Sequence, residues 1–133
     1  MDNNGTYVDY LKQDKKNNCS RIVDKSDPES KRAELEYKVL DCIQTEEKDP
    51  QYLSLVEIKL LTGRHHQIRV QFSGHGTPLY GDGKYGNNEK AVRKSLALCA
   101  CHLKFKHPAT GKIMDFQIKP DTGAFKLFSK SND

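Results

Sequence analysis

The chain has 133 residues, of which 35% are hydrophobic and 30% are charged. This length fits one domain with a modest core, and the composition is typical of a soluble globular protein. No apolar run is long enough to span a membrane, and the N-terminus lacks the basic and then apolar segments of a signal peptide. We therefore expect one cytoplasmic domain over residues 1–133. The four cysteines are too sparse and irregular for a disulfide framework, so free thiols are expected.

The net charge of +4 is unevenly distributed along the chain. Residues 1–62 hold 10 Lys and Arg against 13 Asp and Glu, whereas residues 63–133 hold 12 against 5. A sustained positive potential in the second half favours a polyanionic partner such as nucleic acid. A solvated basic surface without a partner is equally compatible with the charge alone.

The first thirty residues are polar and rich in turn formers. We expect a partly irregular lead-in over 1–30, with short extended pieces at 5–11 and 20–23. A run of turn-favouring residues, including Pro28, predicts a loop over 24–31.

Two alternating segments follow the lead-in. Residues 33–43 place Leu35, Tyr37 and Val39 on one face at period two, and residues 52–61 alternate in the same way. A short charged connection joins them, so an antiparallel pair of strands is the simplest arrangement.

A short helix is predicted over residues 65–73, with Thr62 as its N-cap. Ile68 and Phe72 are four residues apart, and Gly74 or Gly76 would end the helix.

The rest of the chain predicts a loop and two further strands. Residues 79–94 are glycine-rich and loop-like, and residues 95–105 are apolar at nearly every position, as in a strand covered on both faces. A strand at 112–119 and a terminal helical turn at 123–128 complete an α+β fold with an antiparallel or mixed β-sheet and a few short helices.

The stretch TGRHHQIRVQFSGHGTPLYGDGKYG, residues 62–86, carries the chemistry. It is rich in cationic donors, has Asp82 as its one carboxylate, and lies between segments that look buried, which is where a scaffold usually presents a site. Such a stretch favours binding of an anion.

Three motifs follow one another in this half of the chain. They are Thr62-Gly63-Arg64-x-His66-Gln67-Ile68-Arg69-Val70, Gly76-x-Pro78-Leu79-x-Gly81-Asp82-x-x-Tyr85-Gly86, and His107-Pro108-x-Thr110-Gly111. Together they resemble the C-terminal half of the RluA-type RNA pseudouridine synthases, and the resemblance runs from about Gly5 onward.

The resemblance implies isomerisation of uridine to pseudouridine in ribosomal or transfer RNA, without a cofactor. It also implies a base flipped into a basic cleft, which costs a few kcal/mol of unstacking that cleft contacts must offset. Arg69 would pair with a catalytic aspartate and keep it ionised. The residues expected to contact RNA are Arg64, His66, Lys84, Arg93 and Lys94. The residues expected to shape the motif are Gly63, Gln67, Gly81, Asp82, Tyr85 and Gly86.

The family's His-Arg-Leu-Asp segment, which carries the catalytic aspartate, does not occur in this sequence. Asp9, Asp14 and Asp24 lie in no similar setting, and Tyr7 and Tyr10 lie beyond the expected place of the family's pocket tyrosine. The chain is therefore expected to begin partway through a catalytic domain and to be inactive alone. An incomplete sheet would also expose an edge and invite self-association.

Two other functions compete with this interpretation. A non-catalytic RNA-binding module would keep the same basic residues, and the coding sequence upstream of Met1 would separate it from part of an enzyme. A metal site is the other alternative, because the second half of the chain holds His65, His66, His75, Cys99, Cys101, His102 and His107. A Cys-x-Cys strand lacks zinc-knuckle spacing, however, and adjacent helical histidines point apart. No metal is expected.

Overall fold

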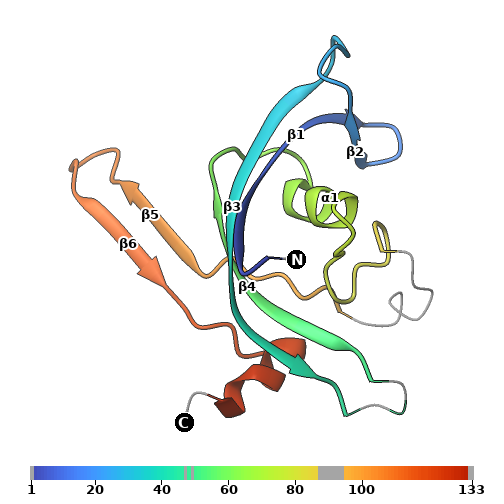
Figure 1. Ribbon diagram of the computed structural model, residues 1–133. Coiled ribbons are helices and arrows are strands. Elements are labelled where there is room, and N and C mark those ends of the chain that lie inside the picture. The colour runs from blue at the N-terminus through green and yellow to red at the C-terminus, as the bar shows by residue number, and fades with distance from the viewer. Residues whose placement is uncertain (1, 47, 49, 87–94, 132–133) are drawn as a thin grey trace. The chain divides into compact units, whose positions relative to one another are not determined.

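The computed structural model describes residues 2–46, 48, 50–86 and 95–131. The chain divides into two compact units, Met1–Leu96 and Ala97–Asp133 (Figure 1). Each unit is described separately below.

The first unit is built on one antiparallel sheet with the strand order β2-β1-β3-β4. Its strands are β1 (Asn4–Asp14), β2 (Cys19–Val23), β3 (Lys31–Gln44) and β4 (Tyr52–Leu60). The two extended pieces expected in the lead-in are confirmed, and the first is longer than expected because β1 pairs with both β2 and β3. The antiparallel pair β3–β4 is also confirmed. Self-association through a sheet edge stays a prediction.

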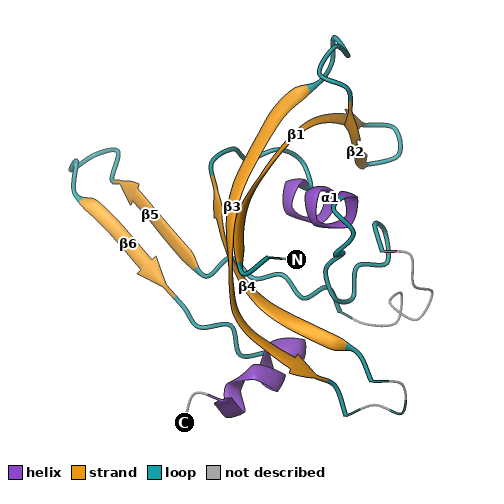
Figure 2. Cartoon of the chain, in the orientation of Figure 1, coloured by secondary structure: helices purple, strands orange, loops and turns teal. Residues whose placement is uncertain are grey.

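The alternation along β3 produces the core. Ala33, Leu35 and Tyr37 are buried on one face of the strand, while their neighbours along the chain are more exposed. The helix α1 (Gln67–Gly74) lies against this face of the sheet (Figure 2). Burying these apolar side chains between the sheet and the helix is the main stabilising contribution in the unit.

A β-bulge interrupts the β3–β4 ladder. The register passes from Val39↔Val56 to Asp41↔Leu55, so Leu40 has no partner on β4 and is 51% exposed. A bulge adds one residue to one strand, and here it shifts which β4 side chains face inward. The strict alternation expected along residues 52–61 therefore breaks near Leu55.

The predicted helix is confirmed with a different start. Thr62 is not its N-cap: the cap position is His66, which has φ 52° and ψ 26° and makes no side-chain cap bond. Thr62 instead uses its hydroxyl to hold β3, accepting from Glu34 N at 2.8 Å. The predicted N-cap was wrong because the Thr62 hydroxyl is hydrogen-bonded to β3 and is not free to accept from an amide of the helix.

A glycine-rich loop follows α1. Residues 79–86 have no helix or strand, as predicted, and residues 87–94 of the same predicted loop lie outside the described residues. The position of Gly81, at φ 80°, suits a residue without a side chain.

The second unit contains the hairpin β5 (His102–Lys106) and β6 (Ile113–Gln117), followed by the 3₁₀ helix η2 (Gly123–Ser131). The predicted strand over 95–105 is wrong for residues 95–101, which have no regular secondary structure. The last bond of the hairpin runs from Ile118 N to Cys101 O, and the β5–β6 ladder pairs residues 102–106 with 113–117 and does not reach residues 95–100. An apolar run without a pairing partner does not form a strand.

No helix in the described part of the chain is long and apolar enough to cross a membrane.

Candidate functional site

Gln67 holds the start of the motif against the sheet. Its Oε1 accepts from Thr62 Oγ1 at 2.8 Å and from Arg64 N at 2.9 Å, and its Nε2 donates to Glu34 O at 3.1 Å. The side chain is 3% exposed, and all its polar groups have partners. The turn of residues 62–67 is therefore fixed to β3 before α1 begins.

Arg69 and Asp82 form a buried ion pair. Nε and Nη2 of Arg69 donate to Oδ2 and Oδ1 of Asp82 at 3.0 and 2.8 Å, and the guanidinium also lies 5.0 Å from the Tyr85 ring centre. Burial alone would raise the pKa of Asp82, but the hydrogen bonds from Arg69 and from backbone amides outweigh it and lower that pKa. The hydrogen bond to Asp82 correspondingly raises the pKa of Arg69. Both groups are charged at neutral pH.

The glycine-rich loop is wrapped around Asp82. Its Oδ1 also accepts from the backbone amides of Lys84 and Tyr85, each at 3.1 Å, and its backbone carbonyl accepts from Gly86 N at 2.9 Å. A carboxylate satisfied by a guanidinium and two amides is an anchor for the loop. Gly81, Asp82, Tyr85 and Gly86 thus shape the loop.

A polar cluster joins this loop to the β1–β2 hairpin, and we call it the histidine clamp: Asn18, Ser20, His65, His66 and Tyr85. Nδ1 and Nε2 of His65 lie 2.7 Å from Ser20 Oγ and 2.9 Å from Asn18 Oδ1. The His65 and His66 rings stack with their centres 3.8 Å apart.

Tyr85 completes the clamp. Its hydroxyl accepts from Ser20 N at 3.0 Å, which leaves the phenol proton for Nδ1 of His66 at 2.7 Å. That bond requires an unprotonated Nδ1. Burial, His65 and two nearby cations lower the pKa of His66, which is consistent with a neutral ring.

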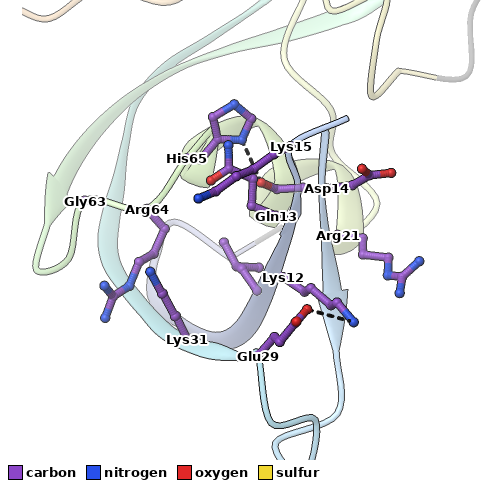
Figure 3. A pocket seen from close by; sticks show the side chains of 12 residues that line it. Lys12, Gln13, Asp14, Lys15, Arg21, Glu29, Lys31, Gly63, Arg64 and His65 are labelled. Carbon is purple, nitrogen blue, oxygen red and sulfur yellow. Dashed lines mark hydrogen bonds and ion pairs between the residues drawn. The ribbon is translucent and has the colours of Figure 1, made fainter. Parts of the chain in front are cut away.

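A cleft of about 750 Å³ lies beside the clamp (Figure 3), and we call it the hairpin cleft. It is lined by Leu11, Lys12, Gln13, Asp14, Lys15, Ser20, Arg21, Glu29, Lys31, Gly63, Arg64 and His65. Its cationic side chains outnumber its two acidic ones, so its potential favours an anion.

Arg64 reaches the cleft from the motif. Its Nε donates to Arg32 O at 2.9 Å, which ties the guanidinium to the backbone of β3. Among the described residues no carboxylate pairs with it, in contrast to Arg69. Of the two motif arginines, Arg64 is the one that lines the hairpin cleft.

The other residues expected to contact RNA have different positions. His66 faces Tyr85 within the clamp, and Lys84 donates through Nζ to Asn18 O. Neither lines the hairpin cleft. Arg93 and Lys94 lie outside the described residues.

The sequence analysis did not identify most of the cationic residues that line the cleft. Lys12, Lys15, Arg21 and Lys31 belong to the half of the chain with a net negative balance. Summing charge over halves could not reveal them, because the fold brings them to one end of the sheet. The alternation in β1 and β2, followed across the hairpin, is the signal that could have grouped them.

The histidines weighed as metal ligands are engaged elsewhere. His75 Nε2 lies 2.9 Å from Asp9 Oδ2, and His102 Nε2 lies 2.7 Å from Asp115 Oδ1. Within the described residues, no three His, Cys, Asp or Glu side chains converge as metal ligands would.

Comparison with known proteins identifies relatives of one kind. The sequence model of a family described as RNA pseudouridylate synthase matches residues 1–74. An "uncharacterized RNA pseudouridine synthase" of Aquifex aeolicus is 40% identical over 103 residues, which are 71% of this chain and 31% of that protein. Ribosomal large subunit pseudouridine synthase D of Zymomonas mobilis is 37% identical over 110 residues, or 77% of this chain and 32% of that protein. The chain thus spans about a third of the length of these relatives.

The fold has a solved counterpart. The structure of human RNA pseudouridylate synthase domain containing 1 superposes with a TM-score of 0.72, at 22% identity, over 91% of this chain and 50% of that one. The antiparallel sheet with its short helices is therefore a pseudouridine synthase fold, as predicted. Since the family model covers more than half of the chain, this protein belongs to the RNA pseudouridylate synthase family.

Proposed function

We propose that this chain forms part of the catalytic domain of an enzyme that isomerises uridine to pseudouridine in RNA, and that the chain alone binds RNA without converting it. The observation that carries the proposal is the position of Arg64. Its guanidinium lines a basic cleft and has no carboxylate partner among the described residues. Ribosomal RNA is the proposed substrate because a relative is named a ribosomal large subunit pseudouridine synthase.

The proposal assigns the pairing role to Arg64 instead of Arg69. The family resemblance gave this role to Arg69 and placed Arg64 among the residues that contact RNA, but both donors of Arg69 that face Asp82 are already bonded to it. A guanidinium with open donors can hold the carboxylate of a His-Arg-Leu-Asp segment, and it would keep that carboxylate ionised. Arg69 then stabilises the fold that presents Arg64.

The carboxylates near the cleft are poor substitutes for a catalytic aspartate. Asp82 is 1% exposed, and both its carboxylate oxygens already accept hydrogen bonds. Asp14 accepts from the backbone amides of Lys16 and Asn17 and from Asn17 Nδ2, and these bonds lower its pKa. Glu29 pairs with Lys12 at 3.2 Å. A carboxylate occupied in this way is not placed to act as a nucleophile or a base.

The test is an isomerisation assay in two stages. The chain is first incubated with uridine-labelled ribosomal RNA, and no pseudouridine is expected. The upstream part of a related synthase, bearing its His-Arg-Leu-Asp segment, is then added in trans, and product is expected. Product from the chain alone would contradict the proposed inactivity.

Variants separate the two arginines in the complemented assay. Arg64→Ala should abolish product while the variant stays folded by circular dichroism. Lys38→Ala, a loss of the same charge elsewhere on β3, should leave the product level unchanged. Full activity of folded Arg64→Ala would refute the role given to Arg64. No product under any condition, with RNA still bound, would favour the non-catalytic RNA-binding module.

A further inference from the structure

We propose that Lys15, Arg21 and Lys31 of the hairpin cleft bind the phosphodiester backbone of the RNA strand and make no contact with the target base. This inference depends on the proposed function in one respect, namely that the ligand is RNA. It assigns a specific part of the substrate to residues of β1, β2 and the start of β3.

The lining of the cleft suits phosphates better than bases. No Phe, Tyr or Trp occurs among the described residues that line it, and its apolar side chain is Leu11. Binding of unpaired bases usually relies on aromatic stacking, whereas backbone binding relies on cations. The ring of His65 is covered on one face by His66, and both its nitrogens are bonded.

Not every cation in the cleft is available to a ligand. Lys12 lies 3.6 Å from Asp27 and 3.2 Å from Glu29, and the hydrogen bond to Glu29 is the main cause of its raised pKa. Lys15, Arg21 and Lys31 are exposed, and no ion pair with a described carboxylate holds them. These three cations are the phosphate-binding groups of the cleft, because the proposed function assigns Arg64 to the catalytic carboxylate.

The sheet itself creates the opening. β1 pairs with β3 only as far as Leu11↔Lys31, yet it continues to pair with β2 as far as Asp14↔Cys19. The last residues of β1 therefore have a strand neighbour on one side only, and the cleft lies where β3 is missing. Figure 3 shows Arg64 and Lys31 at one end of this opening and Arg21 at the other. Cations spread along an opening match the repeating charges of a strand.

The histidine clamp gives these cations fixed positions. His65 holds Asn18 at the end of the hairpin turn and Ser20 in β2, and Lys84 holds the backbone of Asn18. The hairpin is therefore tied to the motif that carries Arg64. Holding charged groups in place before binding reduces the ordering cost of binding.

The experiment compares two ligands of equal length and charge. A short single-stranded RNA and the corresponding abasic strand, which has the same backbone without bases, are titrated into the full chain by fluorescence anisotropy. We expect their Kd values to agree within about twofold, because phosphates supply the contacts. Loss of even one stacked base would weaken binding by roughly 5- to 150-fold.

Charge variants locate the contact. Lys31→Gln and Arg21→Gln should each lower the slope of log K against log salt by about 0.7 for a single strand. Lys38→Gln is the matched control: it removes the same charge from β3 about 23 Å further along the strand and should leave the slope unchanged.

Three results would overturn the inference. These are an abasic strand that binds more than about fivefold more weakly, an unchanged slope in both cleft variants, or absence of RNA binding. The outcome does not depend on catalysis. Failure of the complemented isomerisation assay would refute the proposed function and leave this binding result standing.

Discussion

Nε and Nη2 of Arg69 each donate to a different oxygen of Asp82, at 3.0 and 2.8 Å. Arg69 lies in α1 and Asp82 in the glycine-rich loop, so this pair fastens the loop to the helix. The carboxylate is completely buried and the guanidinium side chain is 19% exposed. Two parallel bonds between planar groups need an arginine, since a lysine ammonium offers one point of contact.

Removing one member of this pair should be costly. Arg69→Ala leaves the Asp82 carboxylate buried without its counter-charge, and breaking a buried pair in this way typically costs about 3–5 kcal/mol. We expect a loss of that order in the free energy of unfolding, measured by urea denaturation. Circular dichroism is the suitable probe because the chain contains no tryptophan.

Arg64→Ala is the control for this prediction. Its side chain is exposed and its bond in the described structure is to the backbone of Arg32, so we expect a change within about 0.5 kcal/mol. If Arg64→Ala proved as destabilising as Arg69→Ala, the division into a structural and a ligand-facing arginine would be incorrect.

Two motif glycines should differ in their tolerance of a side chain. Gly81 has φ 80°, and an added Cβ would meet the backbone carbonyl of Ser95. Gly63 has no atom within 4 Å of such a Cβ. Gly81→Ala should therefore destabilise by at least about 1–3 kcal/mol, and Gly63→Ala by less than about 0.5 kcal/mol. Equal urea midpoints for the two variants would contradict this explanation of the motif.

Local sequence patterns predicted the parts of the fold that local chemistry determines. The alternation of Leu35, Tyr37 and Val39 marked the face of β3 that packs on α1. The apolar spacing within residues 65–73 predicted the helix, and the glycines of residues 79–94 predicted the loop that follows it. These features depend on neighbours along the chain, which a single sequence displays.

Features that depend on distant neighbours could not be predicted. The αL conformation of His66 follows from Thr62 and Gln67 being held by β3, and the bulge at Leu40 follows from pairing with β4. The cationic lining of the hairpin cleft is assembled from β1, β2, β3 and the motif turn. The charge balance along the sequence pointed to residues 63–133, whereas four of the five Lys and Arg residues that line this cleft come from residues 1–62.

The Tyr85 hydroxyl should contribute to stability through the clamp. Tyr85→Phe leaves Ser20 N without its acceptor and His66 Nδ1 without its donor. Ser20 is 6% exposed, and an unsatisfied buried donor costs about 1–3 kcal/mol. We expect a destabilisation in that range and faster amide exchange at Ser20 and its neighbours in β2.

The tyrosine on the outer part of β4 provides the comparison. Tyr52 is 75% exposed, so Tyr52→Phe should leave the free energy of unfolding within about 0.5 kcal/mol of wild type. A Tyr85→Phe variant as stable as Tyr52→Phe would show that the clamp bonds contribute nothing net.

His66 should make stability depend on pH in the weakly acidic range. Burial is the first cause of its lowered pKa, followed by the charges of His65, Arg69 and Lys84. The unfolded chain therefore takes up a proton at His66 at a higher pH than the folded chain does. The contribution of His66 to the free energy of unfolding is therefore fully present above the ordinary histidine pKa of about 6.5. It decreases as the pH falls below that value.

Two substitutions at His66 separate this titration from backbone strain. His66→Asn and His66→Ala both remove the ionisable ring, so the decline in urea midpoint from about pH 7.5 to about pH 5.5 should be smaller than in wild type for both. Asparagine tolerates the observed φ of 52°, whereas alanine does not, so the alanine variant should be less stable by about 1 kcal/mol at every pH. An unaltered pH dependence in both variants would mean that His66 does not titrate differently in the folded chain. Equal stability of the two at neutral pH would mean that the left-handed turn is not strained for alanine.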